Sequence, residues 1–118
     1  MATTQEEAEN FLREFKEKKR FFSIVFLGRD KNLQGCLDLE ITPAEREKYI
    51  DSLKSEDYSE GPNKDNYKPG ASPYWVFGLQ VKKKEVYIKL SKGTENNPVL
   101  CMSFHIAEHP MIYPFKKN

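Results

Sequence analysis

Apolar and polar residues alternate in three runs along the last third of the chain. The runs begin near Tyr74, Glu85 and Val99, and turn-forming or charged residues separate them. A period of two is typical of half-buried β-strands, because successive side chains point to opposite faces of a sheet. We therefore predict three strands, joined at Lys82–Lys84 and at Gly93–Pro98.

The same alternation assigns the side chains of these strands to two faces. The apolar set is predicted to be buried in the core, and it comprises Trp75, Phe77, Val86, Ile88, Leu90, Leu100, Met102, Phe104 and Ile106. The opposite face carries a phenol, an amine, a hydroxyl and an imidazole, from Tyr87, Lys89, Ser103 and His105. A shift of one residue in register would exchange the two faces, so this assignment depends on regular pairing.

Two helices are predicted in the first half of the chain. The first runs from Thr4 to Lys19, with a capping box between Thr4 and Glu7 and an apolar stripe of Ala8, Phe11, Leu12 and Phe15. The second runs from Thr42 to about Lys54, because a capping residue is followed by proline and then by glutamate at the third position. Its predicted buried residues are Tyr49, Ile50 and Leu53.

The connecting segments are less regular. Phe21–Leu27 is aromatic and β-branched, which predicts a strand, and 28–32 has the composition of a turn. Leu33–Ile41 fits a strand by its alternation and a helix by its spacing. Ser55–Pro73 is polar and rich in glycine and proline, so we predict a loop.

Length indicates a single domain spanning 1–118. Charged residues make up 31% of the chain, but the formal net charge is only +1, so the overall charge gives no indication of nucleic-acid binding. Cys36 and Cys101 lie in apolar contexts and are expected to be buried, unpaired thiols of a reduced compartment.

Cellular location is predicted from the N-terminus and from the length of the apolar runs. The N-terminus is acidic and helical in pattern, unlike a signal peptide, and no apolar run is long enough to cross a membrane. We therefore expect a cytoplasmic protein without membrane contact.

The polar face offers groups suited to metal-free cleavage of RNA. This reaction needs a base for the 2′-hydroxyl proton, an acid for the leaving oxygen and a cation beside the phosphate. His105 can serve as base or acid, Lys89 can hold the phosphate, and Tyr87 can donate a proton or a hydrogen bond. An ordinary solvated sheet face explains the same pattern, since only the alternation links these residues.

Residues 105–109 match the H-x-x-E-H pattern of one class of zinc enzymes. That chemistry needs both histidines on one helix face, whereas His105 ends a predicted strand and Pro110 follows His109. A third protein ligand is also needed, and the chain after His109 offers no acidic residue, histidine or cysteine. We therefore predict no metal and no cofactor.

Three consecutive lysines, Lys82, Lys83 and Lys84, are candidate contacts for phosphate groups. Lysine-rich turns are also common where a sheet edge must be kept from pairing with another chain. Trp75 is expected to pack in the core, and base stacking is the alternative.

Several short motifs together resemble the MqsR-like toxins of bacterial and archaeal toxin–antitoxin pairs. They are Asp57-Tyr58-Ser59-Glu60-Gly61-Pro62, Trp75-Val76-Phe77-Gly78, Val86-Tyr87-Ile88-Lys89 and Ser103-Phe104-His105-Ile106-Ala107-Glu108, within residues 31–115. The resemblance implies a small RelE-type α+β fold, with N-terminal helices packed on a C-terminal antiparallel sheet of three to four strands, and a helix over residues 33–40. It also implies metal-independent endoribonuclease activity on mRNA that a cognate antitoxin silences.

Residue by residue, the resemblance implies catalytic roles for Tyr87 and Lys89, which match a tyrosine-x-lysine strand of the family. His105 stands where the better-studied branch carries lysine, Glu60 falls near another lysine position, and Val76 replaces a glutamine. His105 is therefore left to supply the acid–base step, with Ser103, His109 and Lys82–Lys84 as substrate-binding residues. The alternative is a non-catalytic protein-interaction domain on the same fold, using the 55–73 segment and the polar face.

Overall fold

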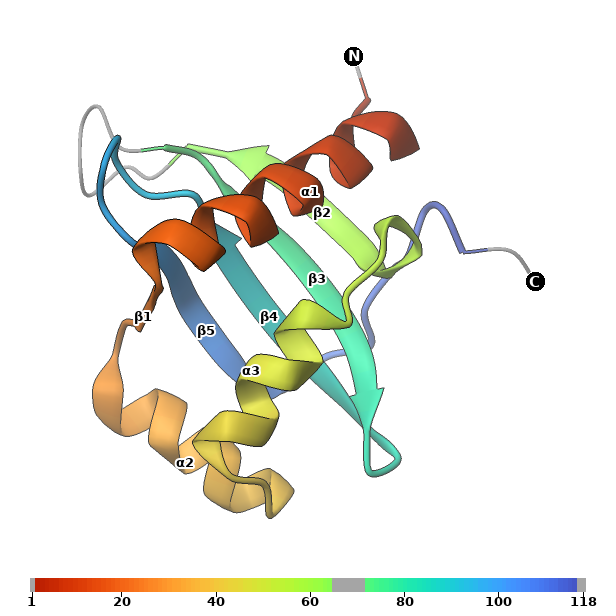
Figure 1. Ribbon diagram of the computed structural model, residues 1–118. Helices are drawn as coiled ribbons and strands as arrows, with labels where there is room; N and C mark the ends of the chain where they lie inside the picture. The colour runs from red at the N-terminus through yellow and green to blue at the C-terminus, as the bar shows by residue number, and fades with distance from the viewer. Residues whose placement is uncertain (1, 65–71, 117–118) are drawn as a thin grey trace.

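Helices cover one face of a five-stranded sheet (Figure 1). The computed structural model describes residues 2–64 and 72–116. Its helices are α1 (Gln5–Phe22), α2 (Arg29–Leu39), α3 (Pro43–Asp51) and the short 3-10 turn η1 (Ser55–Asp57). Its strands are β1 (Ile24–Phe26), β2 (Tyr58–Asn63), β3 (Tyr74–Val81), β4 (Lys84–Ser91) and β5 (Val99–Ile106). The predicted α+β class is confirmed, and strands β2 to β5 follow the three helices as predicted, whereas β1 lies between α1 and α2.

The sheet has the order β1-β5-β4-β3-β2. Strands β2 to β5 pair antiparallel, whereas β1 runs parallel to β5. The prediction of an antiparallel sheet of three to four strands was therefore wrong in two respects, since the sheet is mixed and has five strands. The three strands predicted from alternation correspond to β3, β4 and β5.

Both capping boxes predicted from the sequence are present. Thr4 begins α1 and Thr42 begins α3, each accepting a hydrogen bond from the backbone N–H of a glutamate three residues later. The stripe predicted for the first helix is buried, at Ala8, Phe11, Leu12 and Phe15. In the second predicted helix, Ile50 and Leu53 are buried and Tyr49 is partly buried, although α3 ends at Asp51.

The core lies between α1 and one face of the sheet. The Phe11 ring stacks on Trp75 with centroids 4.7 Å apart and on Phe77 at 5.9 Å. Burial of Trp75, Phe77, Ile88, Leu90 and Phe104 confirms the predicted core face. Cys36 and Cys101 are buried and unpaired, as predicted.

A β-bulge in β5 changes which residues of that strand face the core. Lys89 pairs with Ser103 and Leu90 pairs with Cys101, so Met102 is left without a partner on β4. As a result Val99, Cys101 and Phe104 are buried, whereas Leu100 and Met102 are only partly buried. The prediction that Leu100 and Met102 lie in the core was wrong, because regular alternation does not continue through a bulge.

The segment between the first two helices also differs from the prediction. The strand predicted over Phe21–Leu27 is reduced to β1, because α1 continues through Phe22 and ends at Ser23, where φ is 72°. The turn predicted over 28–32 is instead the start of α2, with Gly28 as its N-cap at φ 60°. Once a helix is nucleated, each further residue extends it at little cost, so α1 outlasts the local strand preference of two phenylalanines.

The predicted helix within Leu33–Ile41 is present as the second half of α2. Gly35 lets this helix approach the edge of β5, since a Cβ atom there would collide with the Phe104 carbonyl oxygen. The predicted loop over Ser55–Pro73 was partly wrong, because it contains η1 and β2. Residues 65–71 of that prediction lie outside the described residues.

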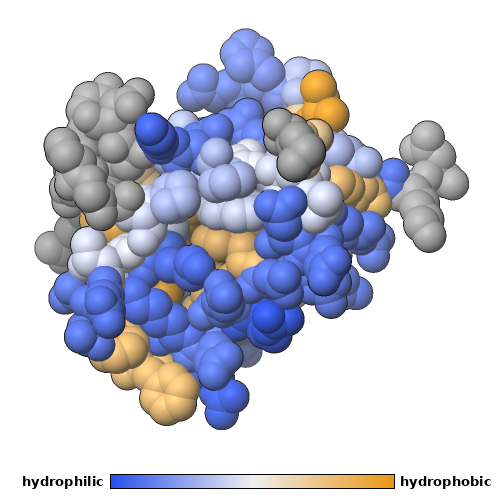
Figure 2. All heavy atoms as spheres, turned by 90° about the horizontal axis from the view of Figure 1, so that it is seen from above, coloured by the Kyte–Doolittle hydropathy of each residue, from blue (hydrophilic) through white to orange (hydrophobic). Residues whose placement is uncertain are grey.

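The surface carries the high content of charged residues expected from the composition. Seen from above, it is mainly hydrophilic, with smaller hydrophobic areas (Figure 2). None of the described helices has the length and the apolar character that crossing a bilayer requires.

Candidate functional site

The sheet face opposite α1 carries the polar residues that alternation predicted. Tyr87 of β4 pairs directly with His105 of β5, and Lys89 pairs with Ser103. Directly opposed residues of antiparallel strands have their side chains in contact range, so two neighbouring cross-strand pairs bring these four groups together. The predicted juxtaposition of Tyr87, Lys89, Ser103 and His105 is present in the structure.

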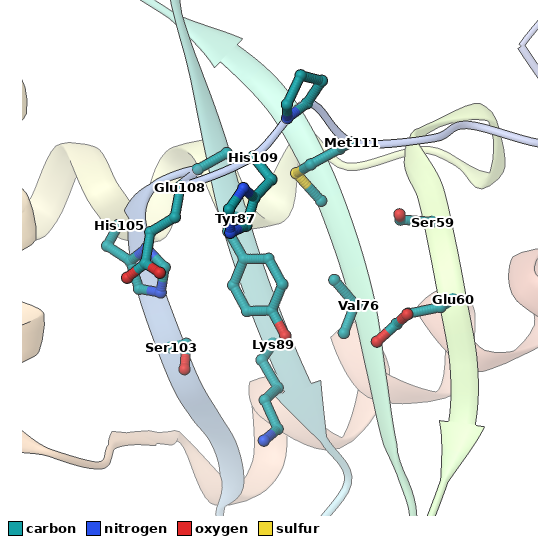
Figure 3. A pocket seen from close by; sticks show the side chains of 12 residues that line it. Ser59, Glu60, Val76, Tyr87, Lys89, Ser103, His105, Glu108, His109 and Met111 are labelled. Carbon is teal, nitrogen blue, oxygen red and sulfur yellow. The ribbon is translucent and has the colours of Figure 1, made fainter.

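These four side chains line an open cleft of about 440 Å³, which we call the polar cleft (Figure 3). Strands β2 to β5 form its floor and walls, and the segment after β5 forms one rim. Its remaining lining residues are Ser59, Glu60, Val76, Ala107, Glu108, His109, Pro110 and Met111.

His105 is oriented by two contacts. Its ring stacks on the Tyr87 ring, with centroids 5.1 Å apart and planes inclined by 14°. Its Nδ1 lies 2.8 Å from the Ile106 carbonyl oxygen, which can only accept a hydrogen bond. Nδ1 therefore carries a proton, and Nε2 is the nitrogen that can exchange a proton with a bound molecule.

Lys89 supplies positive charge at the cleft. Its Nζ lies 3.9 Å from the centroid of the Tyr74 ring, a cation–π contact that restrains the ammonium group. The ammonium group remains a compact charge with donors to spare, which suits it to hold a phosphate oxygen.

Tyr87 is held in its neutral form. Partial burial, the negative charge of Glu60 and the neighbouring Tyr74 raise the pKa of Tyr87, with burial as the largest cause. A tyrosine with a raised pKa keeps its proton, so its hydroxyl serves as a hydrogen-bond donor in the cleft.

The segment 107–115, which we call the C-terminal segment, crosses the same sheet face. The Glu85 carboxylate anchors it by accepting hydrogen bonds from the Met111 N–H at 3.1 Å and from the Tyr113 hydroxyl at 2.8 Å. Gly78 permits this close approach, because a Cβ atom there would meet Met111 and the Tyr113 hydroxyl. The Phe115 ring stacks on Tyr58 at 5.0 Å and fixes the far end.

Of the other predicted site residues, His109 reaches the cleft and the three lysines of the β3–β4 hairpin do not. His109 lies on the rim of the cleft, within the C-terminal segment. Lys82, Lys83 and Lys84 lie at the β3–β4 hairpin and are not among the lining residues. Lys82 instead donates a hydrogen bond of 2.6 Å to the Glu40 carbonyl oxygen.

Sequence reasoning missed the residues that complete the cleft from outside β4 and β5. Ser59 and Glu60 come from β2, which was predicted as loop, and Met111 comes from the C-terminal segment. Glu85 has the same parity as Tyr87 and Lys89, so alternation alone was sufficient to place it on this face.

Within residues 2–64 and 72–116, no three His, Cys, Asp or Glu side chains are grouped so that they could hold a metal ion. The absence of a metal from the mechanism stays a prediction.

Comparison with protein-family models, with curated proteins and with solved structures found no match.

We expect Tyr113 to keep its proton at an alkaline pH at which an exposed tyrosine ionises. Burial, the hydrogen bond to Glu85 and the negative charge of Glu85 raise the pKa of Tyr113, and burial is the largest cause. Such a group contributes stability that is complete below the unfolded pKa of about 10 and is lost as the pH rises toward the folded value. Urea unfolding as a function of pH should therefore show a shallower alkaline loss of stability in Tyr113→Phe than in the wild type. Equal alkaline slopes in the two proteins would contradict this expectation.

Proposed function

We propose that this protein is a toxin-like, metal-independent endoribonuclease that cuts mRNA and is controlled by a cognate antitoxin. The observation that supports the proposal most is the composition of the polar cleft. An imidazole with an available Nε2, an ammonium group and a neutral phenol meet in one open cavity on an exposed sheet face. These are the groups that metal-free cleavage of RNA requires.

Each group has a chemical role in this proposal. His105 transfers a proton through Nε2, since Nδ1 is engaged by the Ile106 carbonyl group. Lys89 offsets the charge that develops on the phosphate, and the Tyr87 hydroxyl donates a hydrogen bond to a phosphate oxygen. Ser103 and His109 contact the substrate from the sides of the cleft.

The arrangement of elements also supports the proposal. The three helices precede strands β2 to β5, with β1 between α1 and α2, and they cover one face of the sheet (Figure 1). The polar cleft lies on the opposite face. A sheet with helices on one face and a polar cleft on the other is the coarse arrangement that the proposal requires. The proposal also includes similarity to RelE-type and MqsR-like toxins, an RNA substrate, an antitoxin and a cytoplasmic location.

The alternative function is a non-catalytic interaction domain. Three apolar side chains close in sequence favour contact with a protein, because Phe21 is 78% exposed, Phe22 40% and Val25 43%. An antitoxin could use the same residues, so they do not exclude a nuclease. Cleavage activity of the purified protein separates the two functions.

We expect the purified wild-type protein to cleave a long RNA in the presence of a chelator and to leave the corresponding DNA intact. Lys89→Ala should lower the cleavage rate by about a hundredfold, since loss of a group that stabilises transition-state charge typically costs this much or more. Lys48→Ala is the control, because this exposed lysine lies on α3 and outside the cleft. A wild-type protein that cuts no RNA and does not slow growth when induced would refute the nuclease function and favour the interaction domain.

A further inference from the structure

A carboxylate completes the polar cleft on the side opposite His105. Glu60 lies on β2, and its carboxylate points across Val76 toward Tyr87 (Figure 3). In a regular strand, Glu60 would share a face with Tyr58, whose ring is buried in the core. The pairing of β2 with β3 is irregular on both sides of Glu60, and this irregularity turns the carboxylate to the cleft face.

The sheet register places Glu60 and His105 on opposite walls. Glu60 pairs with Val76, Val76 pairs with Lys89, and Lys89 pairs with Ser103. These residues span three strand spacings of about 4.8 Å, so the backbones of the two walls are about 14 Å apart. The Glu60 carboxylate points into this interval, and the His105 ring lies on its other side beside the Tyr87 ring (Figure 3). The small Val76 side chain lies between Glu60 and Tyr87.

The charge of Glu60 acts on the centre of the cleft. After burial, it is the largest contribution that raises the pKa of Tyr87. The carboxylate itself is exposed, and its hydrogen bond with Asn63 Nδ2 is long, at 3.5 Å. Its oxygen atoms therefore keep lone pairs that can accept a proton from a bound molecule.

We propose that Glu60 is the general base of RNA cleavage and that His105 is the general acid. This inference rests on the proposed nuclease function and assigns the two proton transfers that the reaction requires. A carboxylate accepts a proton, whereas the protonated imidazole donates through Nε2 while Nδ1–H stays bonded to the Ile106 carbonyl oxygen.

The resulting step is balanced. Glu60 removes the proton of the 2′-hydroxyl, and O2′ forms a bond to phosphorus. The bond from phosphorus to O5′ breaks with its electron pair on O5′, which takes the proton of His105 Nε2. The products are a 2′,3′-cyclic phosphate and a 5′-hydroxyl, and solvent returns the proton from Glu60 to His105. Lys89 and the Tyr87 hydroxyl stabilise the charge on the non-bridging oxygens.

A carboxylate in the cleft that had no catalytic role would only hinder the binding of RNA. RNA is a polyanion, so an acidic side chain in its binding cleft weakens binding by repulsion. Removing such a bystander charge should tighten binding and leave the rate of cleavage equal or higher. Removing a general base should tighten binding and lower the rate, so the two roles predict different signs for the change in rate.

The test compares the wild type, Glu60→Gln and His105→Ala on an RNA oligonucleotide that spans a mapped cleavage site, with chelator present. Glu60→Gln should cleave about a hundredfold more slowly and should lose the acid limb of the pH–rate profile, which reports the essential base. It should also bind the 2′-deoxy analogue at least as tightly as the wild type. Glu56→Gln is the matched control, because this exposed acid on η1 lies outside the cleft.

A substrate with sulfur in place of O5′ distinguishes the base from the acid. A thiolate leaves without protonation, so this substrate should restore cleavage by His105→Ala and not by Glu60→Gln. Wild-type rate and an intact acid limb in Glu60→Gln, or rescue of Glu60→Gln by the sulfur substrate, would overturn the assignment. A wild-type protein that does not cleave would instead refute the proposed function, which is a separate result from either of these.

Discussion

Replacing His105 with alanine is expected to lower the rate of RNA cleavage by about 10²–10⁴-fold, the usual contribution of a general acid or base. A hydrogen bond between Nδ1 of His105 and the Ile106 carbonyl oxygen leaves Nε2 as the nitrogen that is available for proton transfer. Alanine removes the proton donor and leaves the phosphate-binding groups Lys89 and Tyr87 in place. Binding of a 2′-deoxy analogue should therefore change far less than the rate.

Stability provides the control for this variant. His105 is partly exposed and stacks on Tyr87, so its loss should cost no more than about 1 kcal/mol of unfolding free energy. Added imidazole should restore part of the activity of His105→Ala, which a purely structural role would not allow. Cleavage at the wild-type rate by a folded His105→Ala protein would show that the polar cleft is not the active site.

Replacing Phe77 with alanine is expected to lower the free energy of unfolding by about 3–5 kcal/mol. Phe77 is fully buried and lies between the Phe11 ring at 5.9 Å and the Tyr58 ring at 6.1 Å. Its removal leaves a cavity between α1 and β3, and the rigid elements on both sides cannot close it. A loss of this size is a large part of the roughly 5–15 kcal/mol that holds a typical domain folded.

Urea unfolding measures this loss, and Phe21→Ala is the matched control. Phe21 is 78% exposed, so the same substitution there should change stability by no more than about 0.5 kcal/mol. Equal changes in the two variants would mean that the aromatic stack between α1 and the sheet does not hold the fold together.

The sequence was sufficient to predict elements whose causes are local. The capping boxes at Thr4 and Thr42 involve residues three apart, so both helix starts were correct. The alternation of β4 is unbroken, and both of its faces were correct. The strand β2 was missed because Gly61 and Pro62 are typical of loops, although an edge strand with irregular pairing tolerates both.

The candidate site was likewise predictable only where its residues are placed by a local pattern. Tyr87, Lys89, Ser103 and His105 follow from the alternation of two adjacent strands. Glu60 and the C-terminal segment depend on contacts between residues distant in sequence. The position of Glu60 depends on the register of an irregular strand pair, and that of Tyr113 depends on a hydrogen bond to Glu85. No local pattern in the sequence encodes such pairings.

The bulge at Met102 has a consequence for how genes of this kind can diverge. Strand β5 contains one residue more than regular pairing with β4 requires. Cys101 and Ser103 pair with successive residues of β4, and Met102 pairs with none. Loss of the Met102 codon would leave a regular strand with Phe104 still inward and His105 still outward. Insertion of one codon between Phe104 and His105 would instead turn His105 toward the core face of the sheet. Homologous genes are therefore expected to vary in length at codon 102 and not between codons 104 and 105.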